Sequence, residues 1–96
     1  MTIEVYIEEH SAFGDDEPAR RRIGEFTSRA EAVAAAQARV ELILRELHKP
    51  GRTADELYQH WTLFGEDVYL LPGDGEPSFD AYEYAKRHSE TIVKLS

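Results

Sequence analysis

Residues 28–47 read SRAEAVAAAQARVELILREL, and their pattern predicts the clearest helix of the chain. Apolar side chains recur at intervals of three and four residues, which places them on one face of a helix. This inward stripe consists of Val33, Ala36, Val40, Ile43, Leu44 and Leu47. Ser28 and Glu31 have the spacing of a capping box, and Pro50-Gly51 ends the pattern. Alanines in the first half allow the helix axis to lie close to a sheet or another helix.

The sequence before this helix predicts two antiparallel strands. Ile3, Val5 and Ile7 alternate with polar residues, which is the period-two pattern of a half-buried strand. Residues 10–18 are rich in charge, glycine and proline and therefore predict a solvated loop. Residues 20–26 are predicted to be the second strand, with a bulge at Gly24.

The sequence after this helix predicts a short helix from Ala54 to about Leu63. Thr53 and Glu56 repeat the capping-box spacing, and Gly65 is expected to stop the helix in the left-handed conformation. A strand over residues 60–64 is the competing prediction, because tryptophan, threonine and phenylalanine also suit a sheet.

A strand over residues 67–71 and a helix over residues 79–93 complete the chain. Ser78 or Asp80 is expected to cap this last helix. Its inward stripe is predicted to contain Tyr82, Ala85, Ser89, Ile92 and Val93. The order β-β-α-α-β-α predicts an α+β fold: a small three-stranded sheet with two long helices on one face and one short helix. The pattern leaves the strand order open.

Composition narrows the functional classes. The chain has 96 residues, so we expect a single globular domain over residues 1–96. The absence of cysteine excludes disulfides and cysteine-based metal sites or nucleophiles. A net charge of −8 argues against nucleic-acid and membrane partners. No apolar run reaches the length of a signal peptide or a membrane span, and we expect a cytoplasmic monomer or weak homodimer.

Metal and cofactor chemistry finds no support in the sequence. The histidines are His10, His48, His60 and His88, and no two of them have the spacing of a helical metal clamp. The acidic residues 15–17, and Asp74 with Glu76, lack the ligand spacing of a calcium loop. We therefore expect no metal and no cofactor.

Aromatic residues gather in the carboxyl-terminal half of the chain. A binding surface there would contain Tyr58, Trp61, Tyr69 and Tyr84, because tyrosine and tryptophan supply rigid apolar area with a polar tip. The alternative is ordinary core packing. His60 lies at an element boundary beside this group and is a further candidate.

Arginines 20–22 form the basic cluster of the chain. On a strand, Arg20 and Arg22 point to one face, where they could grip a phosphate or a carboxylate. The alternative is that these arginines neutralise Glu4, Glu8 and the acidic loop next to them.

Three segments carry a resemblance to known sequences: residues 24–26 leading into the Ser28 helix, residues 64–69 and residues 79–85. They resemble a family of small bacterial conserved hypothetical proteins to which no activity is assigned. The resemblance spans most of the chain. It implies a compact stand-alone domain and transfers no catalytic residue.

These observations favour a non-catalytic protein-binding or regulatory domain that uses its aromatic carboxyl-terminal half. One alternative is a small ligand-binding protein or enzyme with a pocket between the last helix and the sheet, where Arg20, Arg22, His60 and Asp67 are the first candidates. Another alternative is an acidic mimic of nucleic acid, which requires carboxylates clustered on one face.

Overall fold

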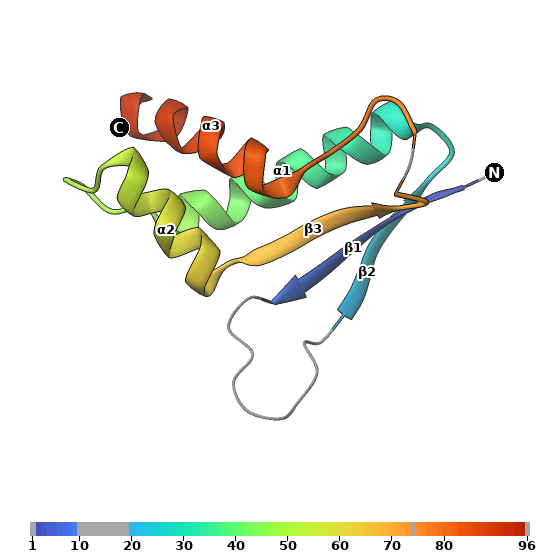
Figure 1. Ribbon diagram of the computed structural model, residues 1–96, viewed down its shortest axis with the longest axis horizontal. Helices are drawn as coiled ribbons and strands as arrows, with labels where there is room; N and C mark the ends of the chain where they lie inside the picture. Colours follow the sequence, from blue (N-terminus) through green and yellow to red (C-terminus); the bar gives the residue numbers. More distant parts are fainter. Residues whose placement is uncertain (1, 10–19, 74, 96) are drawn as a thin grey trace.

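The computed structural model describes residues 2–9, 20–73 and 75–95, which form a three-stranded antiparallel sheet and three helices (Figure 1). In chain order the elements are β1 (Ile3–Glu9), β2 (Arg20–Phe26), α1 (Arg29–Leu47), α2 (Ala54–Phe64), β3 (Glu66–Leu71) and α3 (Ala81–Leu95). The predicted α+β class and element order are confirmed. Residues 60–64 are helical, so the competing strand prediction is wrong.

β1 is the central strand of the sheet, whose order is β2-β1-β3. Val5 and Ile7 on the inner face of β1 lie opposite Leu70 and Val68 of β3, and all four side chains are buried. This match of apolar faces explains why β3 pairs with β1. β2 carries three consecutive arginines and lies at an edge of the sheet, where charged side chains reach water.

The pairing of β1 with β2 contains the irregularity predicted around Gly24. Val5 pairs with Gly24 and Tyr6 pairs with Arg22, so Ile23 has no opposite residue. The extra residue shifts the register by one position. As a consequence, Arg22 lies on the same sheet face as Tyr6.

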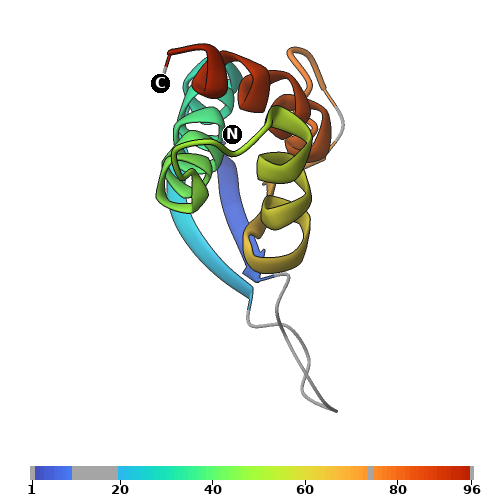
Figure 2. The same ribbon diagram turned by 90° about the vertical axis from the view of Figure 1, so that its left-hand side faces the viewer.

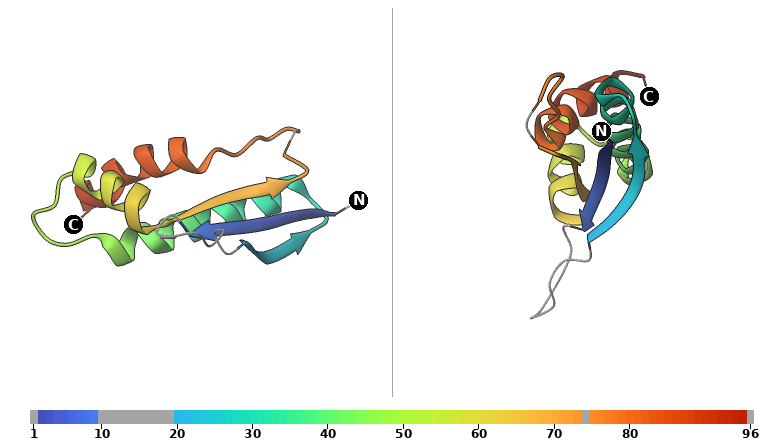
Figure 3. Two further views of the ribbon diagram at one scale, coloured as in Figure 1. Left: turned by 60° about the horizontal axis from the view of Figure 1, so that its bottom comes forward. Right: turned by 90° about the vertical axis from the view of Figure 1, so that its right-hand side faces the viewer.

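α1 crosses the inner face of the sheet, and the left view of Figure 3 shows it behind the strands. Its fully buried residues are spaced by four: Ala32, Ala36, Val40 and Leu44. The predicted stripe is therefore correct along its centre. Val33, Ile43 and Leu47 lie at its border and are only partly buried. Two alanines on the buried line allow the close approach of helix and sheet.

α3 packs against both other helices, and Figure 2 shows it above α1 on one side and α2 on the other. It begins at Ala81, two residues later than predicted, because the Asp80 side chain accepts hydrogen bonds from the backbone N–H groups of Tyr82 and Glu83. Its buried residues are Ala81, Ala85, Ser89 and Ile92. Tyr82 is 43% exposed, so its predicted inward position is wrong.

α2 begins with the predicted cap, but its carboxyl-terminal end differs from the prediction. The Thr53 hydroxyl accepts from the backbone of Glu56, and the Glu56 carboxylate accepts from the backbone of Thr53, which completes a capping box. Gly65 follows the helix with φ −90°, so the predicted left-handed stop is wrong. Glycine is needed there for space, since an added Cβ would lie 2.7 Å from the Trp61 carbonyl oxygen.

Two arginines of α1 join the helix to the chain around β3. Arg39 binds the carboxylate of Glu66 with two hydrogen bonds of 2.8 and 3.0 Å, and Glu66 is almost fully buried. Arg29 donates to the carbonyl oxygens of Pro72, Gly73 and Pro77. The Arg29 contacts position the connection between β3 and α3 against the start of α1, and the Arg39 contact joins the middle of α1 to the first residue of β3.

Some sequence predictions fall outside the described residues. These are the loop over residues 10–18, with His10 and the acidic residues 15–17, and the proposed role of Asp74. Within the described residues, no helix has both the length and the apolar character that crossing a bilayer requires.

Candidate functional site

The sheet has one face that no helix covers in the described part of the chain (Figure 3). Strand alternation places Glu4, Tyr6 and Glu8 on this face, opposite the buried side chains of Val5 and Ile7. We call it the open sheet face and define it by the register-matched residues Glu4, Tyr6, Glu8, Arg20, Arg22, Glu25, Asp67 and Tyr69.

Two tyrosines and an arginine stack at the centre of the open sheet face. Tyr6 and Tyr69 are register partners on β1 and β3, and their ring centroids lie 5.9 Å apart with an interplanar angle of 15°. The guanidinium carbon of Arg20 lies 4.5 Å from the Tyr6 ring centroid and 5.8 Å from that of Tyr69. This cation–π contact holds the Arg20 head group over the aromatic pair.

The carboxylate of Glu4 is engaged within the open sheet face. It accepts a hydrogen bond of 2.9 Å from the Tyr6 hydroxyl. It also forms an ion pair with the Arg22 guanidinium, at an N–O distance of 2.9 Å. These contacts, the tyrosine hydrogen bond first, lower the pKa of Glu4 below its ordinary value. Glu4 therefore remains ionised at neutral pH.

Glu8 is engaged in the same way on the other side of the tyrosine pair. The Tyr69 hydroxyl donates to the Glu8 carboxylate at 3.0 Å. Burial, followed by this hydrogen bond to a carboxylate, raises the pKa of Tyr69. The hydroxyl is therefore protonated at neutral pH and acts as a fixed donor.

Arg20 is the arginine of the open sheet face that is left for a partner. Among the described residues it has no carboxylate within ion-pair distance, whereas Arg22 binds Glu4 and lies 3.7 Å from Glu25. Arg21 is the register partner of Ile7 and lies on the other face of the sheet. The guanidinium of Arg20 is exposed and already oriented by the rings beneath it. Its N–H donors are thus available to a carboxylate from another molecule.

The structure brings together four of the residues that the sequence indicated: Arg20, Arg22, Asp67 and Tyr69. The others lie on helices: Tyr58, His60 and Trp61 on α2, and Tyr84 on α3. Tyr6 was not predicted from the sequence. Its polar-face position in the β1 alternation could have indicated it, but its pairing with Tyr69 depends on the strand order.

Trp61 is part of the core and does not line a surface. Its side chain is fully buried, stacks with Tyr58 at 6.2 Å and meets the Tyr82 ring edge-on at 5.1 Å. His60 contacts Phe64 on the same helix, with ring centroids 5.9 Å apart. The predicted aromatic surface is therefore divided between the core, two helices and the open sheet face.

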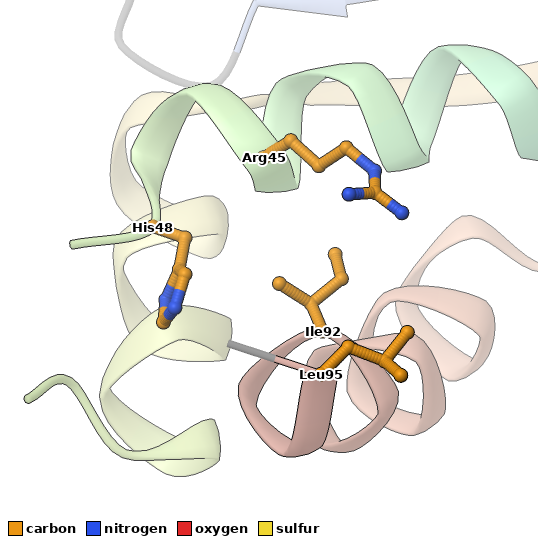
Figure 4. A pocket seen from close by; sticks show the side chains of 4 residues that line it. All are labelled: Arg45, His48, Ile92 and Leu95. Atoms are coloured by element: carbon orange, nitrogen blue, oxygen red, sulfur yellow. The ribbon is translucent and has the colours of Figure 1, made fainter. Parts of the chain in front are cut away.

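Surface hollows lie between α1 and α3. The pocket predicted from the sequence is a different one, between the last helix and the sheet. One hollow of about 160 Å³ is lined by Arg45, His48, Ile92 and Leu95 (Figure 4). Arg45 already donates two hydrogen bonds to Glu41. Both ring nitrogens of His48 are buried and have no hydrogen-bond partner among the described residues. The guanidinium at this hollow is thus already bound by Glu41, and His48 presents no exposed nitrogen to it.

Metal binding is not indicated by the arrangement of side chains. Within residues 2–9, 20–73 and 75–95, no three histidine, aspartate or glutamate side chains are placed to hold an ion.

No protein-family model matches the chain, and neither a curated protein nor a solved structure gives a significant match. The resemblance to small bacterial proteins thus stays a prediction.

Proposed function

We propose that this chain is a non-catalytic protein-binding domain whose open sheet face binds an acidic segment of a partner protein. The observation that carries the proposal is the position of Arg20. Its guanidinium is held over Tyr6 and Tyr69, and it has no carboxylate partner among the described residues.

The residue types of this face support a binding role. Tyrosine and arginine are the side chains that most often dominate the energy of protein interfaces. Tyr6 and Tyr69 are fixed by stacking and by hydrogen bonds to Glu4 and Glu8, so little rotamer entropy is lost when a partner covers them.

The position of Arg20 supports an acidic partner. Glu4 and Glu8 accept hydrogen bonds from neighbouring side chains, whereas the Arg20 guanidinium has no carboxylate within ion-pair distance among the described residues. A carboxylate of the partner that reaches Arg20 forms a charge-assisted hydrogen bond with its guanidinium. The contact leaves no buried charge without a partner.

The ionisation of this face supports a non-catalytic role. The lowered pKa of Glu4 and the raised pKa of Tyr69 move both groups away from neutrality. A general acid or base works best with a pKa close to the working pH. These side chains are suited to fixing a surface and poorly suited to transferring protons.

A display library of short random peptides, selected on the immobilised full chain, tests the proposal. We expect the enriched peptides to contain aspartate or glutamate. Their affinity should fall at least about tenfold for the Arg20→Glu variant, since the reversed charge removes an attraction and adds a repulsion. Lys86→Glu makes the same charge change on the exposed side of α3 and should leave the affinity unchanged.

Two results would overturn the proposal. One is enrichment of peptides that bind the wild type and Arg20→Glu equally. The other is a selection that yields no peptide binding above the level seen with Arg20→Glu.

A further inference from the structure

α1 and α3 lie side by side (Figure 1). The side chains between the two helices leave a hollow of about 290 Å³. One lining residue comes from α1 and four come from α3: Gln37, Tyr84, Arg87, His88 and Thr91. We call this the α1–α3 hollow. It lies apart from the open sheet face, because α3 packs on the helices and on β3.

The lining of the α1–α3 hollow is rich in hydrogen-bond donors. Each lining side chain carries a donor, and none carries a carboxylate. A donor-rich lining of this kind suits an anion.

His88 and Tyr84 are held in fixed positions. Their rings stack with centroids 5.0 Å apart and an interplanar angle of 13°. Nε2 of His88 lies 3.5 Å from the carboxylate of Glu41, which also accepts two hydrogen bonds from Arg45. Glu41 thus faces Nε2 of His88 and is not among the residues that line the hollow.

The donors on the lining are available to a ligand. Among the described residues, Arg87 has no carboxylate within ion-pair distance and the Gln37 amide has no hydrogen bond. Burial and the nearby Glu41 raise the pKa of Tyr84, so its hydroxyl is protonated and can donate at neutral pH.

A second hollow of about 210 Å³ shares Gln37, Tyr84 and Arg87 with the first. It also contains the carboxylates of Asp80 and Glu83. These charges would repel an anion, and the Glu41 carboxylate lies against Nε2 of His88, so the anionic group belongs beside Arg87 and Thr91. The neutral or cationic remainder of a ligand would extend toward the start of α3.

We propose that the α1–α3 hollow binds a small oxyanion, a phosphate or a carboxylate group, between Arg87 and Thr91. Arg87 supplies the charge, and Gln37 and Thr91 supply neutral donors. The site needs no partner protein and does not depend on the function proposed for the open sheet face.

Titration of the ¹⁵N-labelled full chain with sodium phosphate and, separately, sodium acetate tests this site at constant ionic strength. We expect saturable shifts at Gln37, Arg87, His88 and Thr91, with a dissociation constant on the order of 1 mM for at least one anion. Which anion saturates tells a phosphate source from a carboxylate source. Arg87→Gln should weaken binding about tenfold, because one charge-assisted hydrogen bond is lost.

Lys86→Gln is the matched control, since it removes the same charge from the neighbouring exposed position and should bind as the wild type does. Both variants are first compared with the wild type without added anion, to establish that the fold is unchanged. The proposal is overturned if neither anion gives saturable shifts in the hollow, if Arg87→Gln binds as tightly as the wild type, or if Lys86→Gln weakens binding equally.

Discussion

At the scale of single residues, Gly65 shows how tightly the chain is packed where α2 meets β3. Its backbone N–H donates to the Trp61 carbonyl oxygen at 2.9 Å. A Cβ on Gly65 would lie 2.7 Å from that oxygen and 2.8 Å from Cδ1 of the Trp61 indole. The carbonyl is held by the helix and the indole is fully buried, so neither group can easily move aside.

We therefore expect Gly65→Ala to lower the free energy of unfolding by about 1–3 kcal/mol, the usual cost of overpacking a filled site. Urea denaturation followed by Trp61 fluorescence measures it. Gly73→Ala is the control, because its Cβ would meet only the Leu70 carbonyl oxygen, at 3.7 Å. Equal stabilities for the two variants would show that the contact at Gly65 is unimportant.

The residues of the candidate site were predicted individually but not as a group. The sequence indicated Arg20, Arg22 and Tyr69 one by one, because their residue types suit recognition. It grouped Tyr69 with the helical aromatics because they are close along the chain. The sheet register instead pairs Tyr69 with Tyr6, and Arg20 covers both rings. Side-chain chemistry is local, whereas the grouping of side chains depends on strand pairing.

At the scale of elements, successive residues of α1 contact successive residues of α3 in the same order. Gln37 and Tyr84 share a hollow, Glu41 faces His88, and further on His48 and Leu95 line another. The two helices therefore run in the same direction. Glu41 lies in the middle of this contact.

The contact predicts a pH dependence. The hydrogen bonds from Arg45, and then His88, lower the pKa of Glu41 below its ordinary value of 4.5. A carboxyl whose pKa is depressed by folding stabilises the folded state above its unfolded pKa, and that contribution is lost as the pH falls through the folded value. The stabilisation by Glu41 should therefore be complete at neutral pH and fade below pH 4.5.

Glu41→Gln should accordingly lower the thermal midpoint at pH 7 by about 2–4 °C, the range expected for a partly exposed ion pair in a domain of this size. The difference from the wild type should shrink as the pH is lowered toward 3. Circular dichroism melts at several pH values measure it. Glu90→Gln, at an exposed position of α3, is the control and should show neither effect. A difference that stays constant with pH would contradict the role of the Glu41 charge.

At the scale of the whole molecule, a single hydrophobic core joins the elements. β1, β3 and the three helices each contribute fully buried residues, and Phe26 of β2 packs against them. Leu44 of α1 and Trp61 of α2 are among the largest fully buried side chains. Elements that share one core are expected to unfold together.

We expect unfolding curves from Trp61 fluorescence and from far-ultraviolet circular dichroism to coincide. The fluorescence reports the contact of α2 with α3, and the dichroism reports all helices. Leu44→Ala should cost about 2–5 kcal/mol, because it leaves a cavity in the core. Leu42→Ala changes a side chain that is 47% exposed on the same helix and should cost much less. Separate transitions for the two probes would contradict a shared core.

The sequence by itself determined the type and order of the elements, because periodicity and capping act between residues a few positions apart. Ser28, Thr53 and Asp80 each begin a helix as their side-chain chemistry predicts. Only the tertiary structure decided that β3 pairs with β1, that Trp61 is buried and Tyr82 exposed, and that Gly65 is needed for space. These features depend on contacts between segments far apart in the chain, where packing and matching faces override local preference.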